Sequence, residues 1–504
     1  MNLLGIDVGT GGTRALLIDE SGRVLASSTA DHRPFASPQT GWAEQEPQDW
    51  WRACCQAVRQ LLSESGIAAS KISAVGFSGQ MHGAVLLDES GNPLRPSLIW
   101  CDQRTAAEAA ELTQRIGAER LIQLTCNPAL TNFTLTKLLW VRKHEPQIFD
   151  KFRMLQLPKD YVRLRLTGEY AMDMADASGT LLLDVANRRW SSEMATATGI
   201  SLTALPKLFE SSDVCGAISK AGAEQTGLAA GTPVVTGAGD QAAGAVGLGV
   251  VAPGAVHATI GTSGVVFAST SSPKMDPHGR LHTFCHAVTN RWHVMGVTQS
   301  AGLSLRWFRD QFGANSSGGR DPYDVLAEEA ASVNPGSDGV LWAPYLMGER
   351  TPYLDPEARA ALIGLAASHR RAHVVRAIME GVAFSLRDSF SIFEALQMPV
   401  TNVRLGGGGA RSPLWQQIQA DVYDRSVEIV EAEEGAAYGA ALLAGVGAKI
   451  WSTVDEACRN VVRVKARVEP NRESAKIMQR QYSAYRLLYP ALRRIRDAYS
   501  SQNA

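Results

Sequence analysis

The residues of this chain that could do chemistry lie in two glycine-rich loops, Gly9–Gly12 and Gly261–Gly264, and around one aspartate, Asp240. Glycine lets backbone N–H groups approach an anion because no Cβ stands in the way, and Thr10 and Thr13 add hydroxyl donors to the first loop. Both loops are therefore expected to bind phosphate. Because the loop occurs twice, the sequence also predicts two similar half-domains, with the phosphates of a nucleotide between them.

The first loop is expected to join two strands. Short runs rich in strand-forming residues, Leu3–Val8 and Thr13–Asp19, flank it, and a turn leads to a third run at Val24–Ala26. This pattern predicts a three-stranded meander. A dinucleotide-binding fingerprint would instead open a helix, and a Walker loop would end in Gly-Lys-Ser/Thr. A plain hairpin turn is the alternative, but Asp7 before the loop and the second copy favour a phosphate loop.

Asp240 is the acid most suited to catalysis. It follows the apolar pair Val234–Val235 and lies within Gly237–Gly244, among residues too small to shield it, so we expect its carboxylate to face a cleft. Phosphoryl transfer to an alcohol needs one carboxylate to orient the hydroxyl and accept its proton. The spacing fits a helix N-cap equally well, because aspartate is a favoured N-cap residue.

A run of four glycines, Gly406–Gly409, directly follows a predicted strand at Val403–Leu405. Ser412 and Pro413 then open a predicted helix as N-cap and first residue. Bare backbone beside a helix N-terminus suits a flat purine or ribose and nearby anionic groups. A flexible linker is the alternative, but linkers do not usually separate a strand from a well-capped helix. The helix is expected to bury Leu414, Ile418 and Val422.

Helices and strands alternate in both halves, which predicts an α/β protein. A chain of 504 residues is long for one core and should form two or more domains. Since no low-complexity linker marks a boundary, we place it from the repeated loop, giving domains 1–250 and 251–504. The expected elements include helices at 50–62 and 373–387 and strands at 74–77, 83–87, 340–342 and 403–405.

Composition narrows the possible partners. The net charge is -1, with 49 basic and 50 acidic residues and no long single-sign block, so nothing favours nucleic acid or an anionic membrane. Seven cysteines form no C-x-x-C pair, which indicates reduced thiols and a cytoplasmic location. No signal-like or membrane-spanning apolar run occurs. A small-molecule partner is therefore expected.

Eight motifs follow one another along the chain. They are Gly5–Thr10, Gly79–Gly83, Trp100–Arg104, Thr134–Trp140, Gly239–Gly244, Gly261–Gly264, Gly348–Pro352 and Gly406–Ser412. Through them the sequence resembles the FGGY family of carbohydrate kinases over nearly its full length and, within that family, the xylulose kinases. Two positions depart from the family pattern: Asn132 replaces a small or aromatic residue, and Thr136 replaces a proline frequent in xylulose kinases. Both departures are expected to affect the scaffold more than the chemistry.

The resemblance implies an actin-like, ribonuclease-H-like fold, in which two domains close over a cleft with the sugar at its floor and ATP at its mouth. It implies transfer of the γ-phosphoryl group of ATP to the 5-hydroxyl of D-xylulose, which gives D-xylulose 5-phosphate and ADP. Mg²⁺ would accompany the ATP, because this hydrated ion usually needs only one or two protein carboxylates. A homodimer is a further expectation by family analogy.

The same resemblance assigns roles to residues. Asp240 is the implied catalytic base, and Asp7 would help to hold the magnesium–phosphate assembly through water, so both are metal-side candidates. Met81 and His82 would touch the sugar, with Gln80 and Asp102 as further sugar-side candidates. The implied nucleotide-binding residues are Gly9, Thr10, Gly11, Gly12, Thr13, Gly261, Thr262, Ser263, Gly407, Gly408 and Ala410.

His82 shows how the resemblance changes an interpretation. A lone histidine is more often a surface or satisfied core residue. Within its motif, however, the ring could donate a hydrogen bond to a sugar oxygen, while Met81 offers an adaptable apolar wall. Such pairs can discriminate among pentuloses, because a site built to bond a hydroxyl rejects analogues that lack it.

Two alternatives remain open at this point. One is a kinase for another ketose or polyol, such as ribulose, glycerol or gluconate. The other is an ATPase related to actin or the seventy-kilodalton heat-shock chaperones, which share the nucleotide cleft but lack the sugar-side motifs. The segment after about residue 450 carries no motif and is expected to form helices that pack on the C-terminal domain.

Overall fold

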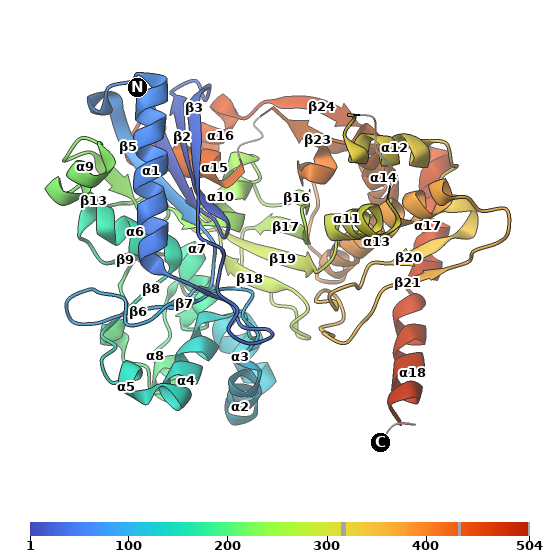
Figure 1. The fold of residues 1–504 in the computed structure, drawn as a ribbon, viewed down its shortest axis with the longest axis horizontal. Helices are drawn as coiled ribbons and strands as arrows, with labels where there is room; N and C mark the ends of the chain where they lie inside the picture. The colour runs from blue at the N-terminus through green and yellow to red at the C-terminus, as the bar shows by residue number, and fades with distance from the viewer. Residues whose placement is uncertain (314–318, 432–434, 502–504) are drawn as a thin grey trace. The chain divides into compact units, whose positions relative to one another are not determined.

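The computed structural model describes residues 1–313, 319–431 and 435–501. Two compact units share the chain (Figure 1). Unit 1 comprises Met1–Pro253, Ser269–His293 and Ala432–Arg463, and unit 2 comprises Gly254–Ala268, Val294–Glu431 and Val464–Ala504. Unit 1 thus takes up two segments that lie beyond the boundary expected near residue 250.

Unit 1 contains a mixed sheet in the order β3-β2-β1-β5-β14-β13. Strands β1, β2 and β3 pair antiparallel, so the predicted meander is confirmed. Strand β5 runs parallel to β1, β14 runs parallel to β5, and β13 is antiparallel to β14. The bounds are β1 Asn2–Val8, β2 Gly12–Asp19, β3 Val24–Asp31, β5 Ile72–Gly79, β13 Val214–Ala217 and β14 Pro233–Val235.

The sheet of unit 2 repeats this arrangement with the strands β17, β16, β22, β23 and β24 as neighbours in that order. Strands β17 and β16 are antiparallel, β16, β22 and β23 are parallel, and β24 is antiparallel to β23. The prediction of two similar halves therefore agrees with the topology. The bounds are β16 Ala255–Ile260, β17 Gly264–Thr270, β22 Asn402–Gly407, β23 Val427–Val430 and β24 Val464–Val468.

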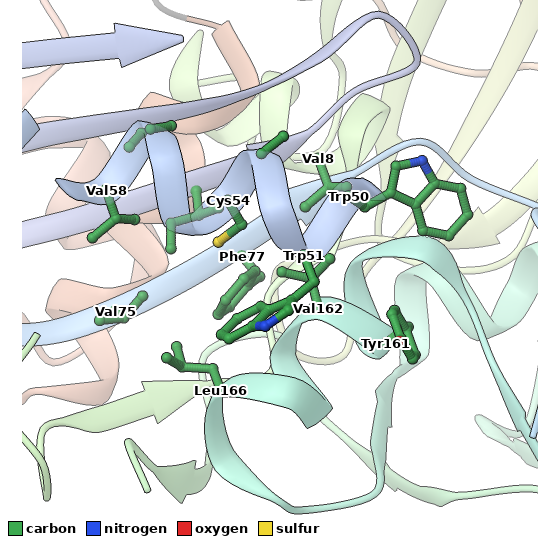
Figure 2. Close-up of a cluster of buried hydrophobic side chains, with 14 of the residues drawn as sticks. Val8, Trp50, Trp51, Cys54, Val58, Val75, Phe77, Tyr161, Val162 and Leu166 are labelled. Carbon is green, nitrogen blue, oxygen red and sulfur yellow. The ribbon is translucent and has the colours of Figure 1, made fainter. Parts of the chain in front are cut away.

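One face of the unit 1 sheet is covered by α1 (Pro47–Ser65) and α6 (Pro158–Thr167). Helix α1 starts with proline at its first turn, where the missing N–H costs nothing, and ends at Gly66 in the left-handed conformation. Its Trp50, Cys54 and Val58 are fully buried, in a core that also contains Val75 and Phe77 of β5 (Figure 2). This core fixes the strands whose ends carry the site.

The other face of that sheet meets α15 (Gly435–Gly447), which packs in turn on α10 (Asp240–Gly247). Glycines make this contact possible. A Cβ on Gly5 would lie 2.0 Å from the carbonyl oxygen of Ala437, and one on Gly76 would lie 2.0 Å from that of Ala440. The backbones of α15 and of the sheet are therefore in direct contact, and α15 fixes the position of α10.

Unit 2 is organised around the long helix α13 (Arg371–Ala395), and the apolar residues on one of its faces, Val375, Ile378, Met379, Val382 and Leu386, are all buried. Helix α14 (Pro413–Tyr423) is capped as predicted, with the Ser412 hydroxyl accepting from the backbone N–H of Trp415. Leu414 is only half-buried, and Trp415 is buried in its place because it faces α13. The chain ends in the expected helices, α17 (Arg472–Tyr485), which packs on α13 and α14, and α18 (Leu488–Ser501).

The remaining elements are mostly short. They are β4 Glu44–Gln45, β6 Val85–Leu87, β7 Ser97–Leu98, α2 Ala106–Ile116, α3 Ala118–Thr125, α4 Thr134–His144, α5 Pro146–Phe149, β8 Met154–Gln156, β9 Ala171–Asp173, α7 Met174–Ala177, β10 Leu183–Asp184, β11 Arg189–Trp190, α8 Ser192–Thr198, β12 Lys207–Phe209, α9 Lys220–Thr226, β15 Ala238–Gly239, β18 His282–Cys285, β19 Trp292–Thr298, α11 Gly302–Phe312, α12 Pro322–Ala331, β20 Leu341–Ala343, β21 Ala361–Ile363 and α16 Val454–Val461.

The structure also bears on the cysteines and on membrane-spanning segments. All seven cysteines have free thiols. Among the helices of the described ranges, none is both long and apolar enough to cross a membrane.

Candidate active site

Three parallel strands of unit 1 bring the predicted catalytic residues together. Strand β5 pairs with β1 on one side and with β15 on the other, with Gly79 opposite both Val8 and Gly239. The carboxyl ends of parallel strands meet at one edge of a sheet. Asp7, the motif that begins at Gly79, and Asp240 therefore converge at this edge.

Asp240 is the first residue of α10, and Gly239 is the N-cap. The side chain of Asp240 therefore does not cap the helix, and its role as a base stays a prediction. The side chain is half-buried, and Oδ1 accepts from the side-chain amide of the adjacent Gln241 at 3.3 Å. Burial, reinforced by the nearby negative charge of Asp7, raises the pKa of Asp240 to about 7. A carboxylate with this pKa is poised to accept a proton near neutral pH.

Asp7 lies one residue before the end of β1. Burial raises its pKa above the usual range, although the Ser78 hydroxyl and the Arg14 guanidinium oppose the shift. Its Oδ1 is buried without a hydrogen-bond partner among the described residues. Since each acid raises the cost of charging the other, the Asp7–Asp240 pair is suited to a cation or to a shared proton.

The first glycine loop is a tight turn between β1 and β2, closed by a hydrogen bond of 3.0 Å from the N–H of Gly9 to the carbonyl of Gly12. Val8 and Thr13 are opposite each other at its base. A Cβ on Gly12 would approach the carbonyl of Ala30 to 2.9 Å, whereas one on Gly11 would meet nothing within 4 Å. Glycine is required at Gly12 by packing, while Gly11 leaves the tip of the loop bare.

Gln80 supports this loop. Its amide nitrogen donates to the carbonyl of Gly9 at 3.2 Å and to Gln45 Oε1 at 2.9 Å, and its oxygen accepts from the Thr10 hydroxyl at 3.4 Å. Gln45 donates to the Thr10 carbonyl at 2.8 Å, and the Trp100 indole donates to the Thr10 hydroxyl at 2.9 Å. Gln80, a sugar-side candidate in the sequence, is therefore engaged in holding Thr10.

Met81 and His82 lie in the turn after β5. The His82 backbone is left-handed, with φ 67°, and its Nδ1 is 2.9 Å from the carbonyl oxygen of Gly179. A carbonyl only accepts, so Nδ1 carries a proton and donates this hydrogen bond. A hydrogen bond from His82 to a sugar oxygen stays a prediction. Met81 packs against both Gly179 and Gly239, where a Cβ would lie 3.5 Å from its Cε and 2.8 Å from its Cγ.

Asp102, the remaining sugar-side candidate, is fully buried. Its carboxylate accepts from the backbone N–H of Ala43 at 2.6 Å and from the Arg104 guanidinium at 2.8 and 3.0 Å. Arg104 in turn stacks on the ring of Trp42, 3.6 Å from its centroid. The structure thus places Asp102 in a buried ion pair.

In unit 2 the second glycine loop and the glycine run also meet at the end of parallel strands, because Ile260 of β16 lies opposite Gly407 of β22. The N–H of Gly261 bonds the carbonyl of Ser263 at 3.0 Å. The carbonyls of Gly261 and Thr262 accept from backbone N–H groups at the start of α11, at 2.8 to 3.1 Å. The loop is therefore fixed to a helix rather than free.

The glycine run forms an ordered corner, not a linker. Gly407 is left-handed at φ 71°, and a Cβ there would lie 2.5 Å from the carbonyl oxygen of Ile260. Gly407 and Gly408 are exposed, and Gly408–Ala410 forms a 3₁₀ turn that leads to α14. Gln416 of that helix donates to the Ala410 carbonyl at 2.6 Å. Bare backbone is thus presented beside a helix N-terminus, as the sequence predicted.

Sequence reasoning missed a cluster of buried charged residues that lies next to Gly239, the residue before Asp240. Lys159 forms ion pairs with Asp160 and Asp173 at 2.6 Å and with Asp176 at 3.3 Å. Asp176 Oδ1 lies 3.2 Å from the position of a Cβ on Gly239. Burial, with the charges of its acidic neighbours, raises the pKa of Asp176 well above its usual range, against the effect of Lys159. Only the tertiary fold joins these residues, so no local sequence signal marks them.

A second missed residue is Glu349 of unit 2. Burial raises its pKa to about 7. Its carboxylate accepts from the Thr298 hydroxyl at 2.6 Å and from the backbone N–H of Gln299 at 3.0 Å. It thereby fixes the end of β19, directly before α11 and the contacts to the second glycine loop. The motif Gly348–Pro352 marked the position, but its role required the fold.

Known proteins match this chain along nearly its whole length. The FGGY family of carbohydrate kinases, N-terminal domain, matches residues 2–247, and the C-terminal domain of the same family matches residues 256–448. A xylulose kinase of Bacillus subtilis is 37% identical over 99% of this chain and 99% of its own. A xylulose kinase of Escherichia coli is 40% identical over 88% of this chain and 90% of its own.

Solved structures agree with the sequence comparison. The crystal structure of a xylulose kinase from Brucella ovis has a TM-score of 0.90 and 37% identity, and covers 98% of this chain and 100% of that one. A gluconokinase of Bacillus subtilis is 33% identical over 88% of this chain and 86% of its own.

The paired sheets, the two glycine loops and these matches define a carbohydrate kinase with the two-domain actin-like ATPase fold. The chain belongs to the FGGY family of carbohydrate kinases. The predicted family and fold class are thereby confirmed, and the alternative of an actin-like or chaperone-like ATPase is set aside. Members of this family use ATP as co-substrate.

Proposed function

We propose that this protein phosphorylates D-xylulose with ATP, giving D-xylulose 5-phosphate and ADP. The observation that carries the proposal is the placement of Asp240. It is half-buried at the start of α10, and burial together with Asp7 brings its pKa to about 7. Met81 contacts the adjoining Gly239 from the turn that also contains His82.

Asp240 is the general base of the proposed reaction. Its carboxylate accepts the proton of the sugar 5-hydroxyl as that oxygen attacks the γ-phosphorus in line with the departing ADP oxygen. The bond between the γ-phosphorus and the bridging oxygen breaks, and ADP leaves with the electron pair. His82 binds the sugar through a hydrogen bond to one of its oxygens, and Met81 packs against the carbon chain.

The residues present also fit Mg²⁺. The Asp7 Oδ1 atom, buried and without a hydrogen-bond partner among the described residues, together with Asp240 offers the one or two carboxylates that this ion uses beside phosphate and water. Within the described ranges, no group of three or more His, Cys, Asp or Glu side chains forms a closed metal site. When bound, Mg²⁺ would neutralise phosphate charge.

Nucleotide binding is assigned to the bare backbone of the two units. In unit 1 the loop that contains Gly9, Thr10, Gly11, Gly12 and Thr13 would bind phosphate. In unit 2 Gly261, Thr262 and Ser263 would do the same, and Gly407, Gly408 and Ala410 would contact the adenosine. The exposed backbone at Gly407 and Gly408 supports the last assignment.

Gluconate is the second candidate substrate, favoured by the one-third identity to the Bacillus subtilis gluconokinase. The two candidates differ in a carboxylate. The ADP-release assay with both substrates distinguishes the two.

The test is ADP release by the purified protein with Mg-ATP and each of D-xylulose, ribulose, fructose, glycerol and gluconate. We expect strong stimulation by D-xylulose alone. Preferential stimulation by gluconate would replace the substrate and leave Asp240 as the base. The variant Asp240→Asn is expected to lose at least about 100-fold in kcat and to keep its affinity for Mg-ATP. Near-normal turnover would exclude Asp240 as the base.

A further inference from the structure

The start of α4 contains two buried polar side chains for which the proposed mechanism has no use. Thr134 and Lys137 are both fully buried. The Thr134 hydroxyl and the Lys137 ammonium each donate to the backbone carbonyl of His82, at 3.1 Å. A carbonyl oxygen has two lone pairs, so these two donors fill its whole acceptor capacity.

The carbonyl they hold belongs to a residue in an unfavourable conformation. A residue other than glycine is strained in the left-handed region and persists there only where its surroundings enforce it. The following residue, Gly83, packs closely on Pro158, since a Cβ there would lie 2.6 Å from Pro158 Cγ. The hydrogen bonds to the carbonyl of His82 are among the contacts that enforce its conformation.

The same element also fixes the ring of His82. Thr134 Oγ1 lies 3.4 Å from the carbonyl oxygen of Gly179, which is the partner of His82 Nδ1. The Phe133 ring packs edge-on against the imidazole, with centroids 5.1 Å apart. Lys137 reaches back to the carbonyl of Asn132 at 2.5 Å, so the loop before α4 is tied to the same point. Backbone and ring are thus held from one segment, residues 132–137.

A lysine is a costly choice for this purpose. Lys137 takes part in none of the ion pairs within the described ranges, and burial lowers its pKa to about 7, although Asp102 opposes the shift. Leaving a charge in such a place costs free energy that an apolar side chain would not. Two hydrogen bonds to backbone carbonyls, of His82 and of Asn132, offset part of the free-energy cost of burying this side chain.

We propose that Thr134 and Lys137 are positioning residues that hold His82 in its left-handed conformation and thereby set the affinity for the sugar. The inference rests on the proposed function at one point, the contact between His82 and the sugar. It adds that this contact is controlled from α4, which touches neither substrate in the proposal.

The first test compares Thr134→Val with Thr136→Val. Both threonines are fully buried in the first turn of α4, but the Thr136 hydroxyl donates to the carbonyl of Phe133 at 2.9 Å and not to His82. Loss of one hydrogen bond is expected to raise the sugar KM of Thr134→Val about 3- to 10-fold, with kcat and the KM for ATP little changed. Thr136→Val should keep the wild-type sugar KM. Equal sugar KM values for the two variants would overturn the inference.

The second test is a double-mutant cycle with His82→Ala. Because Thr134 acts through His82, adding Thr134→Val to His82→Ala should not raise the sugar KM further. Full additivity would show that Thr134 acts by another route and would refute the proposal. Lys137→Met is expected to raise the sugar KM about 10- to 100-fold, since it removes a charged donor.

The outcomes separate this inference from the proposed function. If the wild-type protein phosphorylates none of the sugars, the proposed function fails before any variant is made. If it does, and His82→Ala alone leaves the sugar KM unchanged, the sugar contact is wrong. If His82→Ala raises the sugar KM while Thr134→Val matches Thr136→Val, the positioning role alone fails. Should Lys137→Met not fold, the threonine pair and the cycle still decide.

Discussion

At the scale of single residues, the proposed general base is Asp240, and its proposed role depends on its charge state. A general base must be ionised to work. Since burial and Asp7 bring its pKa to about 7, lowering the pH through 7 protonates it and removes activity. We therefore expect kcat/KM for the sugar to rise tenfold per pH unit below about 7 and to level off above it.

Steady-state kinetics between pH 5.5 and 9 would measure this profile. Asp240→Asn is the matched control, because its residual activity should lack the inflection. A wild-type profile that is flat from about pH 5.5 to 8 would contradict this pKa.

Glu349 leads to a prediction about stability. Its pKa is raised from 4.5 to about 7 in the folded protein, so the folded state holds the proton more tightly than the unfolded state. Its contribution is fully present below about pH 4.5 and is lost as the pH rises to about 7. Across this range the free energy of unfolding of the wild type should fall, by roughly 3 kcal/mol, relative to that of Glu349→Gln.

Urea unfolding at several pH values would give this difference. Glu64→Gln, at an exposed glutamate of α1, is the control and should follow the wild type at every pH. A constant difference between Glu349→Gln and the wild type would mean that Glu349 stays ionised in the folded state.

At the scale of elements, the sequence predicted those helices, strands and turns that are determined by residues close together in the chain. The β1–β2 hairpin, the helix from Pro47 and the Ser412 cap were all recognisable, because turn glycines, prolines and N-cap side chains act on their neighbours in the chain. The cluster around Lys159 and the role of Gln80 were not. Apart from Asp160, which adjoins Lys159, their partners are 14 to 71 residues distant, and only the fold brings them together.

Asp102 shows the same limit for a residue that sequence had singled out. Its motif was recognised, yet whether its carboxylate faced a sugar or an arginine depended on the packing of Trp42 against Arg104. Residue type and motif identify a candidate, whereas its partners decide its role.

The contact between α10 and α15 provides a test at this scale. A Cβ on Gly439 of α15 would lie 1.8 Å from the carbonyl oxygen of Ala243, whereas one on Gly244 of α10 would meet nothing within 4 Å. Gly439→Ala should therefore force the helices apart and destabilise the protein by about 3 kcal/mol or more. Gly244→Ala should stabilise it by about 0.5–1 kcal/mol, because alanine favours the helix.

Thermal and urea unfolding would measure the stability of the two variants relative to the wild type. They carry the same substitution in two helices that pack on each other, so a difference in sign isolates the close approach. Two variants with equal stability would show that the helices can separate at no cost.

At the scale of the whole molecule, the two units do not coincide with two continuous lengths of chain. The family domains match residues 2–247 and 256–448, but α15, which covers one face of the unit 1 sheet, comes from the segment Ala432–Arg463. Because Gly5 and Gly76 lie on this face and have no side chains, α15 is needed to cover the sheet backbone there.

A fragment of residues 1–250 should accordingly fail to fold stably. It retains β1, β2, β3 and β5 but lacks α15, so it exposes apolar surface that is buried in the full chain. We expect strong binding of a hydrophobic dye and unfolding without a cooperative transition. Adding residues 432–463 through a flexible linker should restore a cooperative transition, and a cooperative transition for the fragment alone would contradict the prediction.

The late return of the chain to unit 1 also has a consequence for biosynthesis. The ribosome finishes residue 253 long before it reaches residue 432, and at about 5–20 residues per second this interval lasts about 10–40 s. During that time the nascent sheet has its α1 face covered and its α15 face bare. A molecular chaperone that binds nascent chains would therefore encounter this protein while one face of the unit 1 sheet is still exposed, because α15 has not yet been synthesised.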